Sequence, residues 1–319
     1  MQQTSIGKAV HDMKKRAALF VLILLVAFGY LIGNYFVGYA IRRGNDADPK
    51  AIPAACAAIH DPSTVAPQKP EAVSEEWSMM SVDGLTLRGT HFSPASPSHR
   101  WVILVHGYGR DQRFVWDVAA EYLKRGYEVL TPDMRAAGES DGEYLTMGVK
   151  ESEDVAAWAR QIAARDKEAR IAFHGISMGA ATAMMAASRS DAPPQVAALV
   201  EDCGYTSAYT MFSMQLQKLF GLPEFPIMRC VDAVCRIKAG AWLSDAAPVK
   251  RLPALPTLFI HGDADDLAPV EMMEELYSAS GANPKARLIL PGVGHADAKK
   301  DAPELYYSTI FAFLEPYMD

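Results

Sequence analysis

Gly175-Ile176-Ser177-Met178-Gly179 stands between an apolar run, residues 170–174, and a segment rich in small residues, 180–187. This context places the pentapeptide where a β-strand turns into a helix. Glycines two residues to either side of the serine allow strand and helix backbones to approach closely, and the tight turn lifts the hydroxyl off the end of the sheet. The pattern predicts that Ser177 is a nucleophile; the alternative is a serine in an ordinary glycine-rich turn.

Around this turn, short apolar runs alternate with helical patterns, which is typical of a parallel sheet covered by helices. A β-hairpin at 77–92, turning at Asp83-Gly84, is expected to open the domain. Further strands are predicted at 101–105, 128–131, 171–173, 196–200, 257–260 and 287–290, and helices at 115–125, 147–164, directly after Ser177, 270–280 and 306–317. The prediction is an α/β fold with an eight-stranded, mostly parallel sheet flanked by helices, in a domain spanning 76–319.

The alternation is interrupted between about 205 and 251 by a segment rich in Met, Phe and Leu. This segment is predicted to form two helices broken at Leu222-Pro223-Glu224-Phe225-Pro226. One interpretation is a small helical cap whose apolar side chains line a pocket for an acyl group. The other interpretation is ordinary core packing.

A serine hydroxyl attacks a carbonyl only when a base takes its proton, and a carboxylate must orient that base. In this topology the acid and then the histidine follow the serine, each in a loop after a late strand. His295 lies in the glycine-rich loop 291–296 and is predicted to be the base. The remaining histidines lie before the domain, in its first strands and loops, or directly at strand ends.

The acid is expected in the loop after the strand at 257–260, where Asp263, Asp265 and Asp266 compete. Asp265 stands four residues before Pro269, as in the usual G-x-x-D-x-x-V-P loop, with Ala268 in place of Val. We therefore assign Asp265, with Asp266 second. The other aspartates are expected to bind backbone amides near the start of the next helix.

Attack on a carbonyl creates an oxyanion, which needs preorganised N–H donors. The predicted donors are the backbone N–H of Met178, directly after the nucleophile, and the backbone N–H of Tyr108 in the loop His106-Gly107-Tyr108-Gly109. The His106 side chain is predicted to be structural. The loop 133–140 is predicted to be a scaffold as well, its Asp and Arg tying adjacent turns together.

An apolar run without charged side chains, residues 17–41, is long enough to cross a bilayer, whose hydrocarbon core takes about 20 helical residues. Tyr35, Phe36 and Tyr39 near its end suit the membrane interface. The alternative is a cleaved signal peptide ending at Gly38-Tyr39-Ala40, but such apolar regions usually have about 7–15 residues. We expect residues 1–44 to form a cytoplasmic tail and an uncleaved transmembrane anchor.

The flanking charges indicate the orientation of this anchor. Cations precede the apolar run at positions 8, 14, 15 and 16, whereas cations follow directly only at 42 and 43, beside acids at 46 and 48. By the positive-inside tendency, the N-terminus is cytoplasmic and the catalytic domain lies outside the cell membrane. Prolines scattered between 45 and 75 predict a tether between anchor and domain.

The composition bounds the class of protein. With 319 residues, 50% hydrophobic, one substantial domain with appendages is expected, and a net charge of -7 argues against nucleic acid as a partner. The four cysteines, at 56, 203, 230 and 235, lack zinc-site spacing, so no metal site is expected. Cys230 and Cys235 are predicted to be thiols in a helical stretch, with a disulfide in an oxidising compartment as the alternative.

From about Trp77 to Met318 the chain resembles the α/β-hydrolase superfamily, on motifs at 106–109, 133–140, 175–179, 261–269 and 294–295 in the expected order. The segment Glu201 to Ser207 and the break at Leu222-Pro223 more narrowly resemble a bacterial group of membrane-anchored or exported serine hydrolases related to the Bem46-type and α/β-hydrolase-domain-containing proteins. The resemblance implies a Ser-His-Asp enzyme of esterase, lipase or peptidase type without a cofactor. Ala136-Ala137-Gly138 departs from the usual Arg-Gly-x-Gly spacing, and Ala268 from Val.

The predicted function is hydrolysis of a carboxylic ester with an apolar acyl group, a small molecule or a lipid, by Ser177, His295 and Asp265. A peptidase or acyltransferase with the same triad is the nearest alternative, because the fold alone does not select among these reactions. A non-catalytic, membrane-tethered binding module is the alternative of another class. Its expected sign, loss of a triad residue, is absent from the sequence.

Overall fold

A computed structural model describes residues 2–44 and 67–319. Its eight strands form one sheet in the order β1-β2-β4-β3-β5-β6-β7-β8. The strands are β1 (Val73–Met80), β2 (Thr86–Ser93), β3 (Arg100–Val105), β4 (Glu128–Pro132), β5 (Arg170–Ile176), β6 (Val196–Asp202), β7 (Thr257–Gly262) and β8 (Lys285–Leu290). Strand β2 is antiparallel to β1 and β4, and the strands from β4 to β8 run parallel. The predicted sheet is confirmed.

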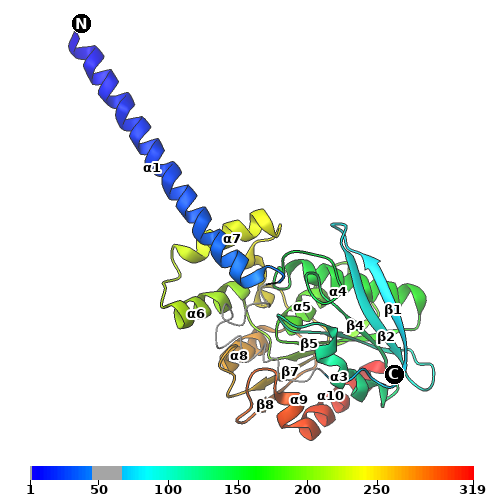
Figure 1. The fold of residues 1–319 in the computed structure, drawn as a ribbon. Coiled ribbons are helices and arrows are strands. Elements are labelled where there is room, and N and C mark those ends of the chain that lie inside the picture. The colour runs from blue at the N-terminus through cyan, green and yellow to red at the C-terminus, as the bar shows by residue number, and fades with distance from the viewer. Residues whose placement is uncertain (1, 45–66) are drawn as a thin grey trace.

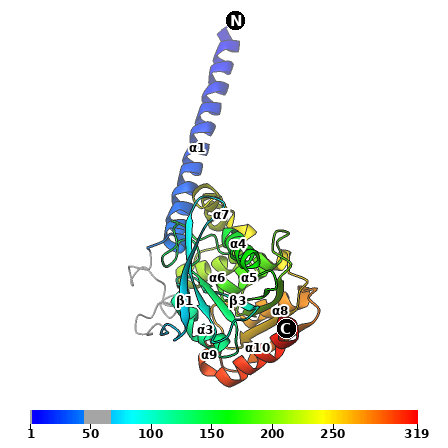
Figure 2. The same ribbon diagram turned by 90° about the vertical axis from the view of Figure 1, so that its right-hand side faces the viewer.

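Helices cover both faces of this sheet (Figures 1 and 2). They are α3 (Trp116–Leu123), α4 (Val149–Arg165), α5 (Met178–Ala187), α8 (Val270–Ala279), α9 (Ala298–Asp301) and α10 (Pro303–Met318), with short 3-10 helices η2 (Gln112–Val115), η3 (Leu243–Asp245) and η4 (Pro248–Lys250). Alternation along β3 divides the core: Ile103 and Val105 pack with residues of α4, α5 and α8, whereas Val102 and Leu104 pack with α3 and α10. The site therefore sits on a sheet buried on both faces.

The first hairpin begins earlier than its apolar residues indicate. Strand β1 starts at Val73 and pairs with β2 from Val73↔Ser93 onward, so residues 73–75, predicted as tether, belong to the sheet. The side chains of Val73 to Glu76 are exposed, and the stretch is held by backbone pairing with β2 and by hydrogen bonds that Glu75 accepts from Trp77 and Glu76 accepts from Thr90. The rest of the predicted tether at 45–66 lies outside the described residues. The predicted turn is present, with Gly84 at φ +85.

The predicted interruption of the α/β alternation contains α6 (Ala208–Phe220) and α7 (Ile227–Lys238), as expected. We call residues 205–251 the cap. Several of its apolar side chains, Met211, Leu216, Ile227 and Met228, are buried in the larger core cluster. For these four residues the core-packing interpretation holds.

The N-terminal helix α1 (Gln2–Ile41) projects from the domain and ends against the cap (Figure 1). Within the described residues, one helix is long and apolar enough to cross a membrane. It is α1, whose stretch His11–Ile41 has a mean hydropathy of 2.3. Its residues from His11 to Phe28 are exposed, and burial begins at Gly29. Its last three turns thus belong to the globular part of the molecule.

Candidate active site

The turn that carries Ser177 joins β5 to α5 at the carboxyl end of the parallel strands. Ser177 has φ 59 and ψ -119, a positive φ that a non-glycine residue adopts only where the surroundings enforce it. A Cβ on Gly179 would lie 2.0 Å from the Val105 carbonyl oxygen, and one on Gly175 would lie 2.2 Å from the Gly179 carbonyl oxygen. Both glycines are therefore required by close backbone approach, as the sequence predicted.

The structure brings together the three side chains predicted to form a triad. His295 Nε2 lies 2.7 Å from Ser177 Oγ, and His295 Nδ1 lies 2.7 Å from Asp265 Oδ2. A carboxylate accepts only, so Nδ1 carries the proton donated to Asp265, and Nε2 accepts from the serine hydroxyl. This is the arrangement in which an imidazole can take the hydroxyl proton.

Asp265 is held ionised by its surroundings. Its Oδ1 accepts the N–H groups of Leu267, at 3.0 Å, and Ala268, at 2.9 Å. Burial alone would raise the pKa of the carboxyl, but the hydrogen bonds from His261 and His295 outweigh it and hold the pKa well below its usual value. Ala268 contributes through its backbone, so replacing the usual Val leaves this contact intact.

The two competing aspartates lie elsewhere. Asp266 is exposed and pairs with Lys218 of the cap at 3.1 Å. Asp263 accepts the N–H of Gly292 at 2.6 Å, which ties its loop to the loop that carries His295. Asp263 thus bonds a backbone amide, but in the loop after β8 and not near the start of α8 (Val270–Ala279), as was expected.

The loop after β3 lies directly beside the nucleophile. A Cβ on Gly107 would lie 3.4 Å from Ser177 Cβ and 3.9 Å from its Oγ, so Tyr108 follows at the edge of the site. Met178 is the first residue of α5, where backbone N–H groups have no partner within the helix. These positions suit the two predicted oxyanion donors, whose role stays a prediction.

The residues predicted to be structural make structural contacts. His106 Nδ1 bonds the Gly107 carbonyl at 2.9 Å, and His106 Nε2 accepts the Met134 N–H at 3.1 Å. Asp133 accepts the N–H of Gln112 at 2.8 Å, and Arg135 donates to Asp154 of α4 at 2.7 Å. These bonds confirm that the loop 133–140 is a scaffold.

A buried polar chain behind the site was not predicted. Burial lowers the pKa of His174 to about 3, so the ring is neutral. Tyr306 donates to Asp202 at 2.8 Å and therefore accepts from His174 Nε2 at 3.0 Å, which leaves Nδ1 to accept from Tyr122 at 3.1 Å. The Asp202 carbonyl in turn accepts the N–H of Ser177 at 2.8 Å. The one sequence signal for this polar chain was a histidine, His174, at the end of an apolar strand.

Cys203 lies close to the predicted acid and base. Its sulfur and one ligand atom each of Asp265 and His295 lie within 4.8 Å of one another. Burial raises the pKa of the Cys203 thiol well above its usual value, so the thiol is neutral and packs as a small apolar side chain. Cys230 and Cys235 are free thiols, as expected.

A cavity of about 350 Å³ lies between the end of α1 and the loop after β3; Met178, the residue after the nucleophile, lines it, whereas Ser177, Asp265 and His295 are not among its lining residues. Residues 40–44 line it, together with the loop 106–111, Arg113, Ala136 to Gly138, Leu145 and Met178. The cap contributes none of the described lining residues. The cavity that Met178 lines is therefore formed by α1 and the domain loops, and differs from the acyl pocket that was expected within the cap.

Several contacts join α1 to the loops of this cavity. The Tyr108 hydroxyl donates to the Ala40 carbonyl, and the Leu145 N–H donates to the Ile41 carbonyl at 2.9 Å. Arg43 donates to the Gly138 carbonyl at 2.6 Å. The sequence offered one signal that was missed, Gly29 and Gly33 spaced four apart in an apolar helix, which is typical of close helix packing.

A mostly parallel eight-stranded sheet, with a serine in the strained turn after its central strand, defines the α/β-hydrolase class of fold. The chain belongs to the Alpha/beta hydrolase family, whose model matches residues 102–307. Membership of this family supports a hydrolase. The narrower Bem46-type group stays a prediction.

The chain is similar to the uncharacterized protein YqkD of Bacillus subtilis, with 26% identity over 75% of this chain and 78% of that protein. It is also similar to the uncharacterized protein Rv2307c of Mycobacterium tuberculosis, with 29% identity over 67% of this chain and 70% of that protein.

Among solved structures, an esterase of Pyrococcus furiosus, Pf2001, matches with a TM-score of 0.64 and 23% identity, covering 80% of this chain and 98% of the esterase. An acylaminoacyl peptidase of Pyrococcus horikoshii matches with a TM-score of 0.60 and 17% identity, covering 78% of this chain and 42% of the peptidase. At these identities the likeness shows the fold alone.

Proposed function

We propose that this protein is a membrane-anchored serine hydrolase that cleaves carboxylic esters through an acyl-enzyme on Ser177. The observation that carries the proposal is the pair of 2.7 Å contacts that link Ser177 to His295 and His295 to Asp265. A hydrogen-bonded chain of this kind activates a hydroxyl that is otherwise a poor nucleophile.

In the proposed reaction, Ser177 Oγ attacks the ester carbonyl while His295 Nε2 takes its proton. The tetrahedral oxyanion is stabilised by the N–H groups of Met178 and Tyr108. Collapse of the intermediate expels the alcohol, which receives the proton from His295 and leaves the acyl group on the serine. Water, deprotonated by His295, then releases the acid. Asp265 keeps Nδ1 protonated and stabilises the imidazolium.

An ester is favoured over a peptide because α1 and the cap against which it packs expose large apolar side chains. These surfaces suit an acyl chain better than a polar peptide backbone. The cavity itself is lined by Arg42, Arg43, Arg110 and Arg113 besides apolar residues. A peptidase or acyltransferase would use the same three side chains, so the substrate panel must include peptides.

Retention of α1 forms part of the proposal. Cleavage at Gly38-Tyr39-Ala40, the alternative considered from the sequence, would detach the carbonyl that accepts the Tyr108 hydroxyl and remove part of the cavity wall. An uncleaved anchor leaves both in place. The charge distribution around α1 supports a cytoplasmic N-terminus and an extracytoplasmic domain.

The test is labelling of the full-length protein in detergent with a fluorophosphonate probe. Wild-type protein should be labelled, Ser177→Ala should not, and His295→Ala should be labelled at least about 100-fold more slowly, since the general base is lost. A folded wild-type protein that does not react would contradict the proposal and favour a non-catalytic binding module. Rates on p-nitrophenyl esters of increasing chain length and on peptide substrates then separate esterase from peptidase.

A further inference from the structure

One face of α1 is built into the cap. The buried residues of α1 follow a spacing of four, at Gly33, Val37 and Ile41, and the half-buried Gly29 extends the same face. A Cβ on Gly33 would lie 2.4 Å from the Cys230 carbonyl oxygen and 2.7 Å from Val234 Cγ2. The backbones of α1 and α7 therefore touch, and the helix has a fixed position on the cap.

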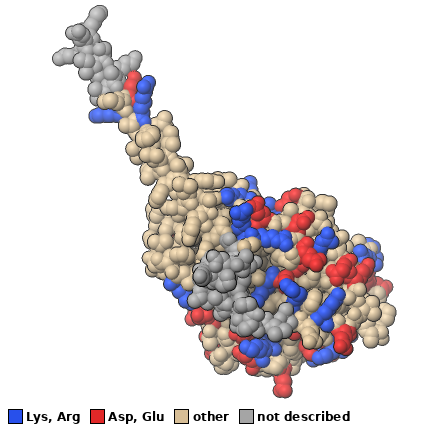
Figure 3. Space-filling view, viewed as in Figure 1, with Lys and Arg blue, Asp and Glu red and all other residues tan. Residues whose placement is uncertain are grey.

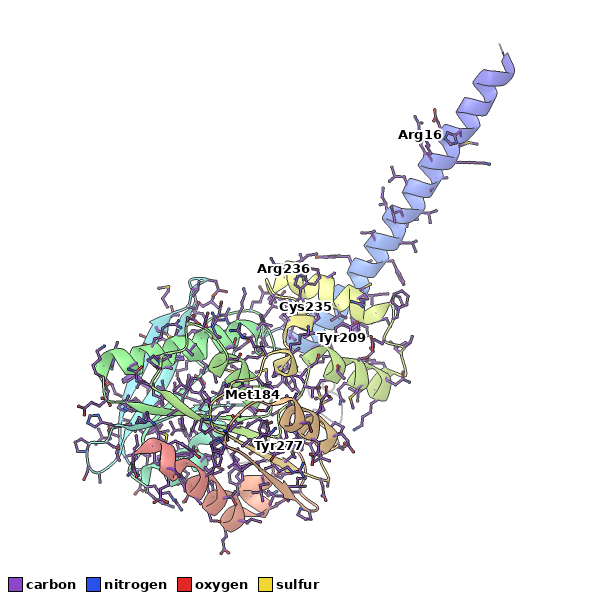
Figure 4. All side chains as sticks on the ribbon, turned by 180° about the vertical axis from the view of Figure 1, so that it is seen from behind. Arg16, Met184, Tyr209, Cys235, Arg236 and Tyr277 are labelled. Atoms are coloured by element: carbon purple, nitrogen blue, oxygen red, sulfur yellow. The ribbon has the colours of Figure 1, made fainter. Side chains whose placement is uncertain are left out.

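Aromatic side chains extend this contact to α6. The ring centroids of Phe36 and Phe220 lie 5.4 Å apart, and those of Tyr39 and Phe220 lie 5.7 Å apart, both edge to face. Figure 4 shows Tyr209 of α6 and Cys235 of α7 at the foot of α1, with Arg16 far along the helix. We call the exposed stretch of α1 between Arg16 and the cap, residues 17–28, its free part.

This free part is shorter than a bilayer is thick. From Ala17 to Phe28 the helix measures about 18 Å at 1.5 Å per residue, whereas the hydrocarbon core of a bilayer is about 30 Å thick. Shifting the bilayer toward the N-terminus would bury Lys14, Lys15 and Arg16 in hydrocarbon, which is costly. A bilayer that encloses α1 from Ala17 onward therefore reaches the cap.

The cap carries the side chains that such a position requires. Phe225 is 75% exposed, Ile237 67% and Trp242 42%. Exposed cations on α7, Arg236 among them, can extend to the lipid head groups while their stems lie against apolar surface. Figure 3 shows uncharged surface around the foot of α1, with charged residues gathered over the rest of the domain.

The cavity lined by Met178 and Tyr108 also reaches the end of α1. Residues 40–44, where α1 ends, line it together with Met178 and Tyr108. This cavity offers a path from the last turn of α1, past Arg42 and Arg43, to the two residues predicted to supply the oxyanion donors.

We infer that the cap rests in the outer part of the bilayer and that the enzyme takes its substrate, an amphiphilic ester resident in the membrane, directly from the lipid along the end of α1. The substrate half of this inference rests on the proposed esterase function. The docking half does not, because it follows from the packing and length of α1 and from the exposed apolar residues of the cap.

Docking is tested by the fluorescence of full-length protein in phosphatidylcholine vesicles that contain lipids brominated along their acyl chains. Trp242 at the membrane should be quenched by these lipids, so Trp242→Phe should lose most of the quenching seen in the wild-type protein. Equal quenching of wild type and Trp242→Phe would overturn the docking of the cap.

Substrate entry is tested with 4-methylumbelliferyl palmitate held in vesicles and with soluble 4-methylumbelliferyl acetate. Gly33→Ala pushes α1 away from α7, whereas Gly38→Ala is its matched control, since nothing lies within 4 Å of a Cβ there. We expect Gly33→Ala to lower the ratio of palmitate to acetate hydrolysis about tenfold or more and Gly38→Ala to leave it unchanged. An unchanged ratio in both variants would overturn entry along α1.

Fluorophosphonate labelling separates this inference from the proposed function. A wild-type protein that is labelled and cleaves the acetate, but not the palmitate in vesicles, retains the proposed function and overturns the inferred substrate. A folded wild-type protein that is neither labelled nor active on either ester overturns the proposed function and the inferred substrate together, while the quenching result still decides the docking.

Discussion

Asp265 and Asp266 are adjacent in the chain but lie in opposite environments, one buried against His295 and the other exposed beside Lys218. We expect Asp265→Asn to slow fluorophosphonate labelling of Ser177 by about 10⁴-fold, because an amide in place of the carboxylate favours the wrong tautomer of His295. Asp266→Asn is the matched control and should label at the wild-type rate. A comparable loss in both variants would contradict the assignment of Asp265.

Glu201 lies at the end of β6, where it accepts the N–H of Gly204. Burial raises the pKa of its carboxyl from 4.5 to about 7, so the folded protein holds a proton that the unfolded chain has released over this range. The free energy of unfolding should therefore fall as pH rises from about 4.5 to 7, by about 3 kcal/mol from this group alone. Glu201→Gln should remove that fall.

The measurement is the denaturant midpoint of full-length protein in detergent at pH 5 and pH 8. Glu201→Gln should be stabilised relative to wild type at pH 8 and not at pH 5. Glu304→Gln, on an exposed position of α10, is the control and should keep the wild-type difference between the two pH values. The same pH dependence in wild type and Glu201→Gln would show that Glu201 does not titrate in this range.

At the scale of elements, the join between β5 and α5 depends on Gly179. Its close approach to the Val105 carbonyl leaves no space for a side chain, so Gly179→Ala should displace α5 from β3 and destabilise the protein by about 1–3 kcal/mol. Because α5 carries Met178 at its first position, labelling of Ser177 should slow as well. Thermal unfolding and labelling rates provide the measurement.

The matched control is Gly281→Ala, since nothing lies within 4 Å of a Cβ at that position. It should unfold at the wild-type temperature, or slightly above it because alanine restricts the unfolded chain. If Gly179→Ala behaved like Gly281→Ala, the close packing of strand and helix at the turn would not be what positions the nucleophile.

Helices and strands could be predicted where the local sequence had a clear apolar pattern. Strands buried on both faces gave continuous apolar runs, and β7 at Thr257–Gly262 was predicted within two residues at its end. Strand β1 was predicted late, because its first residues are exposed and gave no apolar signal. The order of the motifs selected Ser177 and His295, because each follows a strand whose carboxyl end reaches the same edge of the sheet. The choice of Asp265 among three aspartates also needed its spacing to Pro269.

At the scale of the whole molecule, prediction failed where contacts join distant parts of the chain. The packing of Gly33 on Cys230 and the bond from Tyr108 to Ala40 depend on where the sheet places the cap and the loop after β3. No periodicity within either segment encodes such a contact. The polar chain from Tyr122 through His174 to Tyr306 was missed for the same reason, since its members come from α3, β5 and α10.

The orientation of the molecule in the membrane is the remaining prediction at this scale. Arg42 pairs with Glu143 at 3.0 Å and Arg43 donates to a carbonyl of the loop 133–140, so both cations are bound to the domain. Lys14, Lys15 and Arg16 lie within α1, where their side chains are exposed, and Arg16 is far along the helix from the cap (Figure 4). By the positive-inside tendency we therefore predict that the domain lies outside.

We expect protease added to right-side-out membrane vesicles to remove an epitope tag fused after Asp319, and the tag to be protected in inside-out vesicles. Replacing Lys14, Lys15 and Arg16 by Glu should produce a mixed population, because the charge difference across α1 is then reversed. Protection of the tag in right-side-out vesicles would place the domain in the cytoplasm. The substrate would then be an ester of the inner leaflet, while the packing of α1 on the cap would bring the site to the membrane in the same way.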